Sequence, residues 1–201
     1  MLVLAFDTAT AVATSALCHS ERGRVLGERS SRAVRILEDV DELLREAGVD
    51  RGAIEAIVVG TGPGSYTGLR MGLVTARTLA LALDVTVAGV STLAALAEGA
   101  PGALPLIDGR RSEVFALDEG VPVVLPADEL KVEPGKTYVG DGAVRYREHI
   151  ENGGGVVPPD EDAVHLPWAR HHAALAKDFG PAERAEPIYL RLPDAERALS
   201  R

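Results

Sequence analysis

A glycine-rich segment at residues 60–70 is the part of the chain best suited to binding a charged ligand. It joins an apolar run at 54–59, which predicts a buried strand, to an apolar run at 69–83, which predicts a helix. Free N–H groups at a helix N-terminus favour anions, and ligands usually bind at the carboxyl ends of strands in open α/β sheets. Gly62, Gly64 and Ser65 are therefore candidate phosphate-binding residues. The segment lacks the P-loop lysine and the Gly-x-Gly-x-x-Gly spacing of a dinucleotide site.

A second polar group, Asp7-Thr8-Ala9-Thr10, follows the first predicted strand at residues 2–6. An acid at a strand end, followed by small hydroxyl residues, can orient a metal ion or a phosphate. Asp7, Thr8 and Thr10 are therefore candidate ligand-binding residues. The same residues could instead cap the turn into the next strand.

No set of residues in the sequence predicts a catalytic nucleophile with its base, or a metal site. Ser65 does not lie in a Gly-x-Ser-x-Gly turn, and no histidine has zinc-ligand spacing. The histidines are expected to be solvated surface residues: His19, His149, His165, His171 and His172. A solvated face is also expected for the acids of the first predicted helix: Glu38, Asp39, Asp41 and Glu42.

The order of predicted elements indicates a mixed α/β sheet with helices on its faces. Apolar runs predict strands at 2–6, 14–19, 24–29, 53–59 and 85–90. Helical spacing predicts helices at 33–47 and 69–83, and Ser91 is expected to cap a short helix that ends at residue 98. The resulting order, β-β-β-α-β-α-β, is that of the ribonuclease-H-like core of the actin, sugar-kinase and Hsp70 group.

A turn-rich joint at residues 99–102 divides the chain into two predicted subdomains, 1–100 and 101–201. The second, smaller subdomain is expected to hold short strands at 104–107, 113–117, 121–125 and 137–139. A helix at 168–179 and an extended segment at 185–191 follow, and both could pack back on the first subdomain.

The helix predicted at 69–83 is apolar around most of its surface, so two of its faces require burial. One face can pack on the sheet, and the other needs a cover: either the second subdomain or another subunit. The residues predicted to form a subunit interface are Tyr66, Leu69, Arg70, Leu73, Val74, Ala76, Arg77 and Ala80, with Ile36 and Val40 of the first helix.

The composition limits the class of protein. The chain has 201 residues, 46% of them hydrophobic, and a net charge of −9, which argues against non-specific nucleic-acid binding by this chain alone. Its single cysteine, Cys18, excludes a disulfide framework and suggests a cytoplasmic protein. No apolar run reaches the roughly 20 residues that span a bilayer, so no membrane contact is expected.

Five segments, in order along nearly the whole chain, resemble the TsaB (YeaZ) family. The glycine-rich segment is the most specific of them, and the Asp-x-Arg-Arg-x-Glu-Val-aromatic pattern supports it. The five segments lie at residues 4–10, 59–72, 89–93, 107–115 and 187–191.

The resemblance implies an actin-like (ASKHA) fold of two subdomains, the second reduced. It also implies a non-catalytic subunit of the complex that makes N6-threonylcarbamoyladenosine at position 37 of tRNAs reading codons that start with A. The implied partners are a TsaD-type catalytic subunit, which the family contacts through the two N-terminal helices, and a TsaE-type ATPase. The tRNA would be reached only through the complex, ATP or ADP could bind near the subunit interface, and the chain alone is expected to form a homodimer.

The sequence departs from the family pattern at Ser31-Arg32-Ala33, where members often carry a histidine after a longer loop. In TsaD-like relatives, histidines on this helix bind a metal, so no metal site is expected here. Two alternative functions stay open. One is a nucleotide-dependent enzyme of the sugar-kinase/actin type that uses Asp7 and the glycine segment, and the other is a metal-dependent peptidase.

Overall fold

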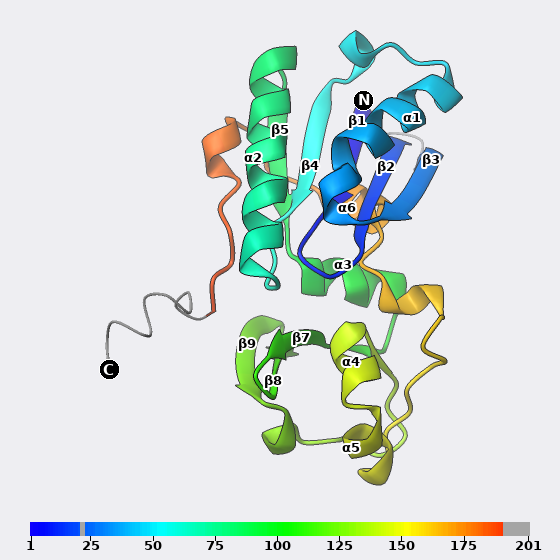
Figure 1. Ribbon diagram of the computed structural model, residues 1–201, viewed down its shortest axis with the longest axis vertical. Coiled ribbons are helices and arrows are strands. Elements are labelled where there is room, and N and C mark those ends of the chain that lie inside the picture. The colour runs from blue at the N-terminus through cyan, green and yellow to red at the C-terminus, as the bar shows by residue number, and fades with distance from the viewer. Residues whose placement is uncertain (21–22, 191–201) are drawn as a thin grey trace.

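A computed structural model describes residues 1–20 and 23–190 as two lobes, one on either side of α3 (Thr92–Gly99) (Figure 1). The N-terminal lobe is built on a five-stranded sheet with the order β3-β2-β1-β4-β5. Its strands are β1 (Leu2–Asp7), β2 (Ala13–His19), β3 (Arg24–Ser31), β4 (Ala56–Gly60) and β5 (Thr86–Val90). The first three strands are antiparallel neighbours, and β4 and β5 run parallel to β1. The predicted mixed sheet is confirmed.

Helices cover both faces of this sheet. Alternate residues of β1 divide between the faces: Leu4 and Phe6 pack towards α1 (Ile36–Ala47) and α2 (Tyr66–Leu83), whereas Val3 and Ala5 pack towards α6 (Ala169–Leu175). In Figure 1, α1 and α2 lie in front of the sheet and α6 lies behind it. The central strands are therefore buried on both faces, as their continuous apolar sequence requires.

The C-terminal lobe contains a three-stranded antiparallel sheet, a two-stranded parallel pair and two short helices. The core of this lobe forms around Leu106, Tyr138 and Ile150. Its elements are β6 (Leu104–Pro105), β7 (Ile107–Arg110), β8 (Glu113–Asp118), β9 (Val121–Pro126), β10 (Tyr138–Val139), α4 (Asp141–Arg145) and α5 (Arg147–Asn152).

Hydrogen bonds from side chains explain where several elements begin. Ser65 accepts from the Gly68 amide, so α2 begins at Tyr66, three residues before the apolar run that predicted it. Ser91 caps α3 as predicted, by accepting from Ala94. Asp50 accepts from Gly52 and forms a 3₁₀ turn, so β4 begins at Ala56 and not at residue 53.

The predicted helix at 168–179 is wrong in its length, because α6 ends at Leu175. The chain then runs extended, and Gly180 pairs with Val87 at the edge of the sheet. The two helices α4 and α5 have no counterpart in the sequence prediction. Residues 21–22, between the strands predicted at 14–19 and 24–29, and residue 191 of the predicted extended segment lie outside the described residues. Within the described part of the chain, no helix is long and apolar enough to cross a membrane.

The single cysteine should be unreactive in the folded protein. Cys18 is 5% exposed, and burial is the main cause that raises the pKa of its thiol to about 11, with a smaller contribution from Glu28. The thiolate is the reactive form, so at pH 8 a folded chain is predicted to react with a disulfide reagent far more slowly than the same chain in denaturant. Spectrophotometric thiol titration measures both rates. Equal rates would show that Cys18 is not held in the core.

Candidate functional site

The glycine-rich segment uses its backbone donors within the chain. The Thr61 amide donates to the Val90 carbonyl at 2.8 Å, and the Gly62 amide donates to the Thr92 hydroxyl at 3.1 Å. The Ser65 amide donates to the Ala9 carbonyl at 2.7 Å. A phosphate cradle needs such N–H groups directed at the ligand. These three amides are already engaged with strands and loops of the same lobe, so the predicted phosphate cradle is not open at these positions.

The glycines of this segment instead allow three chain segments to approach closely. A Cβ on Gly60 would lie 2.0 Å from an Asp7 carboxylate oxygen, and one on Gly68 would lie 2.0 Å from the Thr8 carbonyl oxygen. A Cβ on Gly64 would lie 2.4 Å from the Ala9 carbonyl oxygen. Each of these contacts is possible only without a side chain. The glycine spacing therefore seats the 7–9 turn against the loop and the start of α2.

Asp7 lies at the centre of this packing and is fully buried. Its Oδ1 accepts from the Ala9 amide at 2.6 Å, and its Oδ2 accepts from the Thr92 hydroxyl at 2.6 Å. His172 Nε2 lies 2.7 Å from the same Oδ2, but the two groups are not aligned as a hydrogen bond. One carboxylate thus joins β1, α3 and α6.

These contacts correct two expectations. Asp7 and Thr8 are buried, and Gly62 is buried beside them, so none of the three presents a side chain or surface to a ligand. The histidines are not all solvated surface residues, because His172 is 0% exposed and His165 is 5% exposed. His165 accepts from the Gly140 amide at 3.0 Å and lies 3.2 Å from the Pro158 carbonyl oxygen, so it packs inside the C-terminal lobe.

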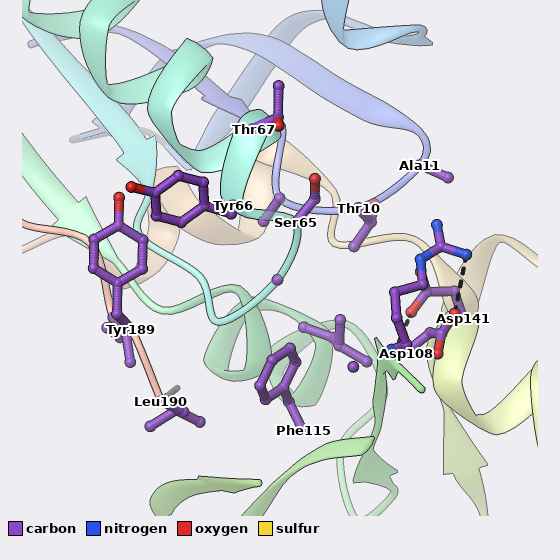
Figure 2. Close-up of a pocket in the computed structure, with 16 residues that line it drawn as sticks. Thr10, Ala11, Ser65, Tyr66, Thr67, Asp108, Phe115, Asp141, Tyr189 and Leu190 are labelled. Carbon is purple, nitrogen blue, oxygen red and sulfur yellow. Dashed lines mark hydrogen bonds and ion pairs between the residues drawn. The ribbon is translucent and has the colours of Figure 1, made fainter. Parts of the chain in front are cut away.

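A cleft of about 400 Å³ lies between the two lobes (Figure 2). Of the predicted ligand-binding residues, Thr10, Gly64 and Ser65 line it from the N-terminal lobe. Phe115, Asp108 and Asp141 line it from the C-terminal lobe. Figure 2 shows the Asp108 and Asp141 side chains at one end and the Tyr66 and Tyr189 rings at the other.

The acidic end of the cleft is balanced by arginines. Asp108 lies 3.2 Å from the Arg110 guanidinium and 3.6 Å from that of Arg145. Asp141 accepts from the Asp108 amide at 2.9 Å. Burial raises the pKa of Asp141 above its usual value, and this hydrogen bond opposes the rise. The carboxyl groups therefore serve the structure of the cleft wall, where they cap the free edge of β7.

The predicted interface residues divide into two groups. Six of them are buried on the inner sides of α1 and α2, so they cannot contact a partner. These six are Ile36, Val40, Leu69, Leu73, Ala76 and Ala80. Their assignment to an interface is corrected here. Arg77 donates to the Ala185 carbonyl at 2.9 Å, within the chain. Tyr66, Arg70 and Val74 lie on the outer side of α2.

The outer side of the two helices carries uncovered apolar side chains. Val74 is 63% exposed and Leu81 is 86% exposed on α2. Val34, in the 3₁₀ turn (Ala33–Arg35) that contacts α2, is 75% exposed, and Leu37, at the start of α1, is 57% exposed. The second lobe does not cover them, so of the two covers that the sequence left open for this side of α2, the second subdomain is not the one found. We call Tyr66, Arg70, Val74, Leu81, Val34 and Leu37 the docking face.

The acids of α1 are only partly a solvated face. Asp39 is 4% exposed and accepts from the Ser31 hydroxyl. The guanidinium groups of Arg29 and Arg35 lie 2.9 and 3.6 Å from the carboxylate oxygens of Glu42. These pairs hold α1 against β3, next to the docking face. Among residues 1–20 and 23–190, no three His, Cys, Asp or Glu side chains gather as a metal site would require.

Comparison with known proteins now places the chain in a family. Residues 8–140 match the family model described as "TsaD: tRNA N6-adenosine threonylcarbamoyltransferase". The chain is 31% identical to the "tRNA threonylcarbamoyladenosine biosynthesis protein TsaB" of Bacillus subtilis, over 98% of this chain and 96% of that protein. This chain belongs to the TsaB (YeaZ) family. The protein of the same name from Escherichia coli is 39% identical over 57% of this chain and 53% of its own length.

Solved structures agree with this membership. "YeaZ from Pseudomonas aeruginosa" has a TM-score of 0.75 at 31% identity, covering 94% of this chain and 99% of that chain. The ethanolamine utilization protein EutJ of Carboxydothermus hydrogenoformans, at 12% identity and a TM-score of 0.51, shares the fold, covering 86% of this chain and 88% of that chain. The predicted family and the predicted actin-like fold class are confirmed.

Two residues of this TsaB-family chain that contact Asp7 escaped the sequence prediction. Thr92 and His172 meet Asp7 from 85 and 165 residues away, and only the fold brings them together. A signal for His172 does exist in the sequence. Ala169, His172 and Ala173 share one helical face, and a histidine among alanines on a buried face requires a partner.

The Asp7 contacts generate a stability prediction. His172→Ala removes a buried partner of the Asp7 carboxylate and leaves a cavity, so it is predicted to lower the free energy of unfolding by about 2–4 kcal/mol. Urea denaturation followed by circular dichroism measures the loss. His19→Ala, at the end of β2 and outside these contacts, is the control and should cost less than about 1 kcal/mol. Equal losses in the two variants would contradict the account.

Proposed function

We propose that this chain acts in the biosynthesis of tRNA threonylcarbamoyladenosine as a non-catalytic subunit that binds a TsaD-type partner. The observation that carries the proposal is the docking face on α1 and α2. Val74 and Leu81 are exposed on α2, and the opposite side of this helix packs in the core. Exposed apolar side chains that gather on one surface mark protein interaction sites, and a subunit interface would bury Leu81, which is 86% exposed.

The chemistry of the docking face suits a protein partner. Apolar side chains occupy its middle, and Tyr66 and Arg70 stand at one end, with the Arg70 guanidinium 4.3 Å from the centre of the Tyr66 ring. Tyrosine and arginine carry much of the binding energy in protein interfaces. An interface of ordinary size covers about 800 Å² on each partner, which is within the reach of two adjacent helices.

The proposed lack of catalytic activity has separate support. Asp7 is the acid that the sequence pattern favoured for ligand binding, and both of its carboxylate oxygens contact groups inside the protein. Binding of tRNA is then left to the rest of the complex, which agrees with the net charge of −9. We also propose that a TsaE-type ATPase joins this complex and that the chain forms a homodimer when the partner is absent.

Charged substitutions on the docking face test this function. Val74→Arg and Leu81→Arg should each leave the fold intact, because both side chains are exposed, and should weaken co-elution with a TsaD-type protein about tenfold or more. Val121→Arg, at a position 62% exposed on β9, is the matched control. Size-exclusion chromatography of the mixed proteins is the measurement. Co-elution of both α2 variants at wild-type strength would refute the docking face. Leu73→Arg and Ala76→Arg are unsuitable, because both residues are buried.

The nucleotide-dependent enzyme is the second candidate, and the 400 Å³ cleft is the observation that favours it. The engaged amides of Thr61, Gly62 and Ser65 weigh against phosphate binding there. Titration calorimetry of the isolated chain with ATP and Mg²⁺ is predicted to show no micromolar binding. A micromolar Kd that is lost in Thr10→Arg, which would fill the cleft, would favour the enzyme. A metal-dependent peptidase would need a ligand set that the described residues do not bring together.

A further inference from the structure

The segment at residues 185–190 crosses from one lobe to the other without being part of either sheet. The chain crosses between the lobes twice, at residues 100–103 and again before α6. The segment at 185–190 links the lobes a third time, by non-covalent contacts with both of them (Figure 1). It is fixed first to the N-terminal lobe. Ala185 is 2% exposed, its carbonyl accepts from Arg77 at 2.9 Å, and the Ile188 amide donates to the Thr61 carbonyl at 2.8 Å.

The far end of the segment reaches the C-terminal lobe. Leu190 packs against the apolar cluster that includes Ile107, Phe115 and Val124, on the face of the three-stranded sheet that meets α3. Ile188, Tyr189 and Leu190 all line the cleft between the lobes. In Figure 2 the Leu190 side chain lies near Phe115, while the Tyr189 ring points up towards the start of α2.

Tyr189 provides a link to the docking face. Its ring lies 5.1 Å from that of Tyr66, centre to centre, with 34° between the planes. The other neighbour of Tyr66 is Arg70, above its ring. A group that covers Tyr66 and Arg70 therefore acts on the same ring against which the segment rests.

We propose that residues 185–190 form a strap that holds the two lobes together across the cleft, and that a partner docked at Tyr66 and Arg70 sets lobe closure through Tyr189. The second half of this proposal rests on the proposed function; the first half does not. The strap is short and two of its contacts are single side chains, Tyr189 and Leu190. Lobe closure can therefore be changed by small shifts at either of them.

The distance between the lobes tests the strap directly. Spin labels on Arg51→Cys, in the 3₁₀ turn before β4 of the N-terminal lobe, and on Lys136→Cys of the C-terminal lobe report that distance by pulsed electron resonance. Both positions are exposed and lie outside the docking face, and Cys18 is buried. Tyr189→Ala combined with Leu190→Ala should lengthen and broaden the distance distribution. Val121→Ala, an exposed valine of the same lobe, is the control and should leave it unchanged. A distribution identical to that of the unsubstituted strap would overturn the proposal, provided circular dichroism shows the variant folded.

A TsaD-type protein added to the same labelled chains tests the coupling. Partner binding should shift the distribution in the chain with an intact strap, and should have no such effect in the strap variant. Binding without any shift in the intact chain would overturn the coupling and leave the proposed function standing. Absence of binding, seen as no co-elution, would overturn the proposed function together with the coupling. The distance distributions of the isolated chain and its strap variant would still test whether residues 185–190 hold the lobes together.

Discussion

The fold of the N-terminal lobe depends on one buried carboxylate. Asp7 lies at the carboxyl end of β1, and its two oxygens receive the Ala9 amide, the Thr92 hydroxyl and the His172 ring. An ionised carboxylate without water is costly unless donors surround it. The Thr92 hydroxyl and the His172 ring come from distant parts of the chain, so their contacts with this carboxylate tie α3 and α6 to the end of β1.

The glycine-rich segment follows from the same constraint. Thr92, which donates to Asp7, also accepts from the Gly62 amide, and the loop can reach it only because Gly60 and Gly68 leave room for the 7–8 turn. The loop thus became a packing element in a chain where the sequence pattern suggested a ligand site. Its rigid attachment sets the direction of α2, and the outer side of α2 is the surface that we assign to a partner. In this account Asp7 and the glycine-rich loop serve the packing of the N-terminal lobe, and we place the proposed function on the docking face.

Much of this could be predicted from the sequence, because local signals decided it. The apolar runs and the Ser91 cap predicted the strands, the order of elements along the chain and the helices that cover the sheet, whereas the Ser65 cap, which starts α2 at Tyr66, was not predicted. The excess of apolar residues on α2 indicated two faces that need burial, and left open whether the second subdomain or another subunit covers the outer one; the second lobe leaves Val74 and Leu81 exposed. Which side of the helix is exposed could not be predicted, because alanines and leucines occupy both sides. In the structure, Leu73, Ala76 and Ala80 face the sheet, whereas Val74 and Leu81 face away from it. Contacts across long sequence separations, such as Asp7 with His172, were likewise out of reach.

The central claim is that partner binding occurs on the docking face and not in the cleft, and site-specific labelling tests it most directly. A maleimide would be applied to Val74→Cys, on the docking face, and to Thr10→Cys, in the cleft, each with and without a TsaD-type protein. Cys18 contributes little background because it is buried. The account predicts that the partner protects position 74 from labelling and leaves position 10 reactive. Protection of position 10 with position 74 still reactive would contradict it.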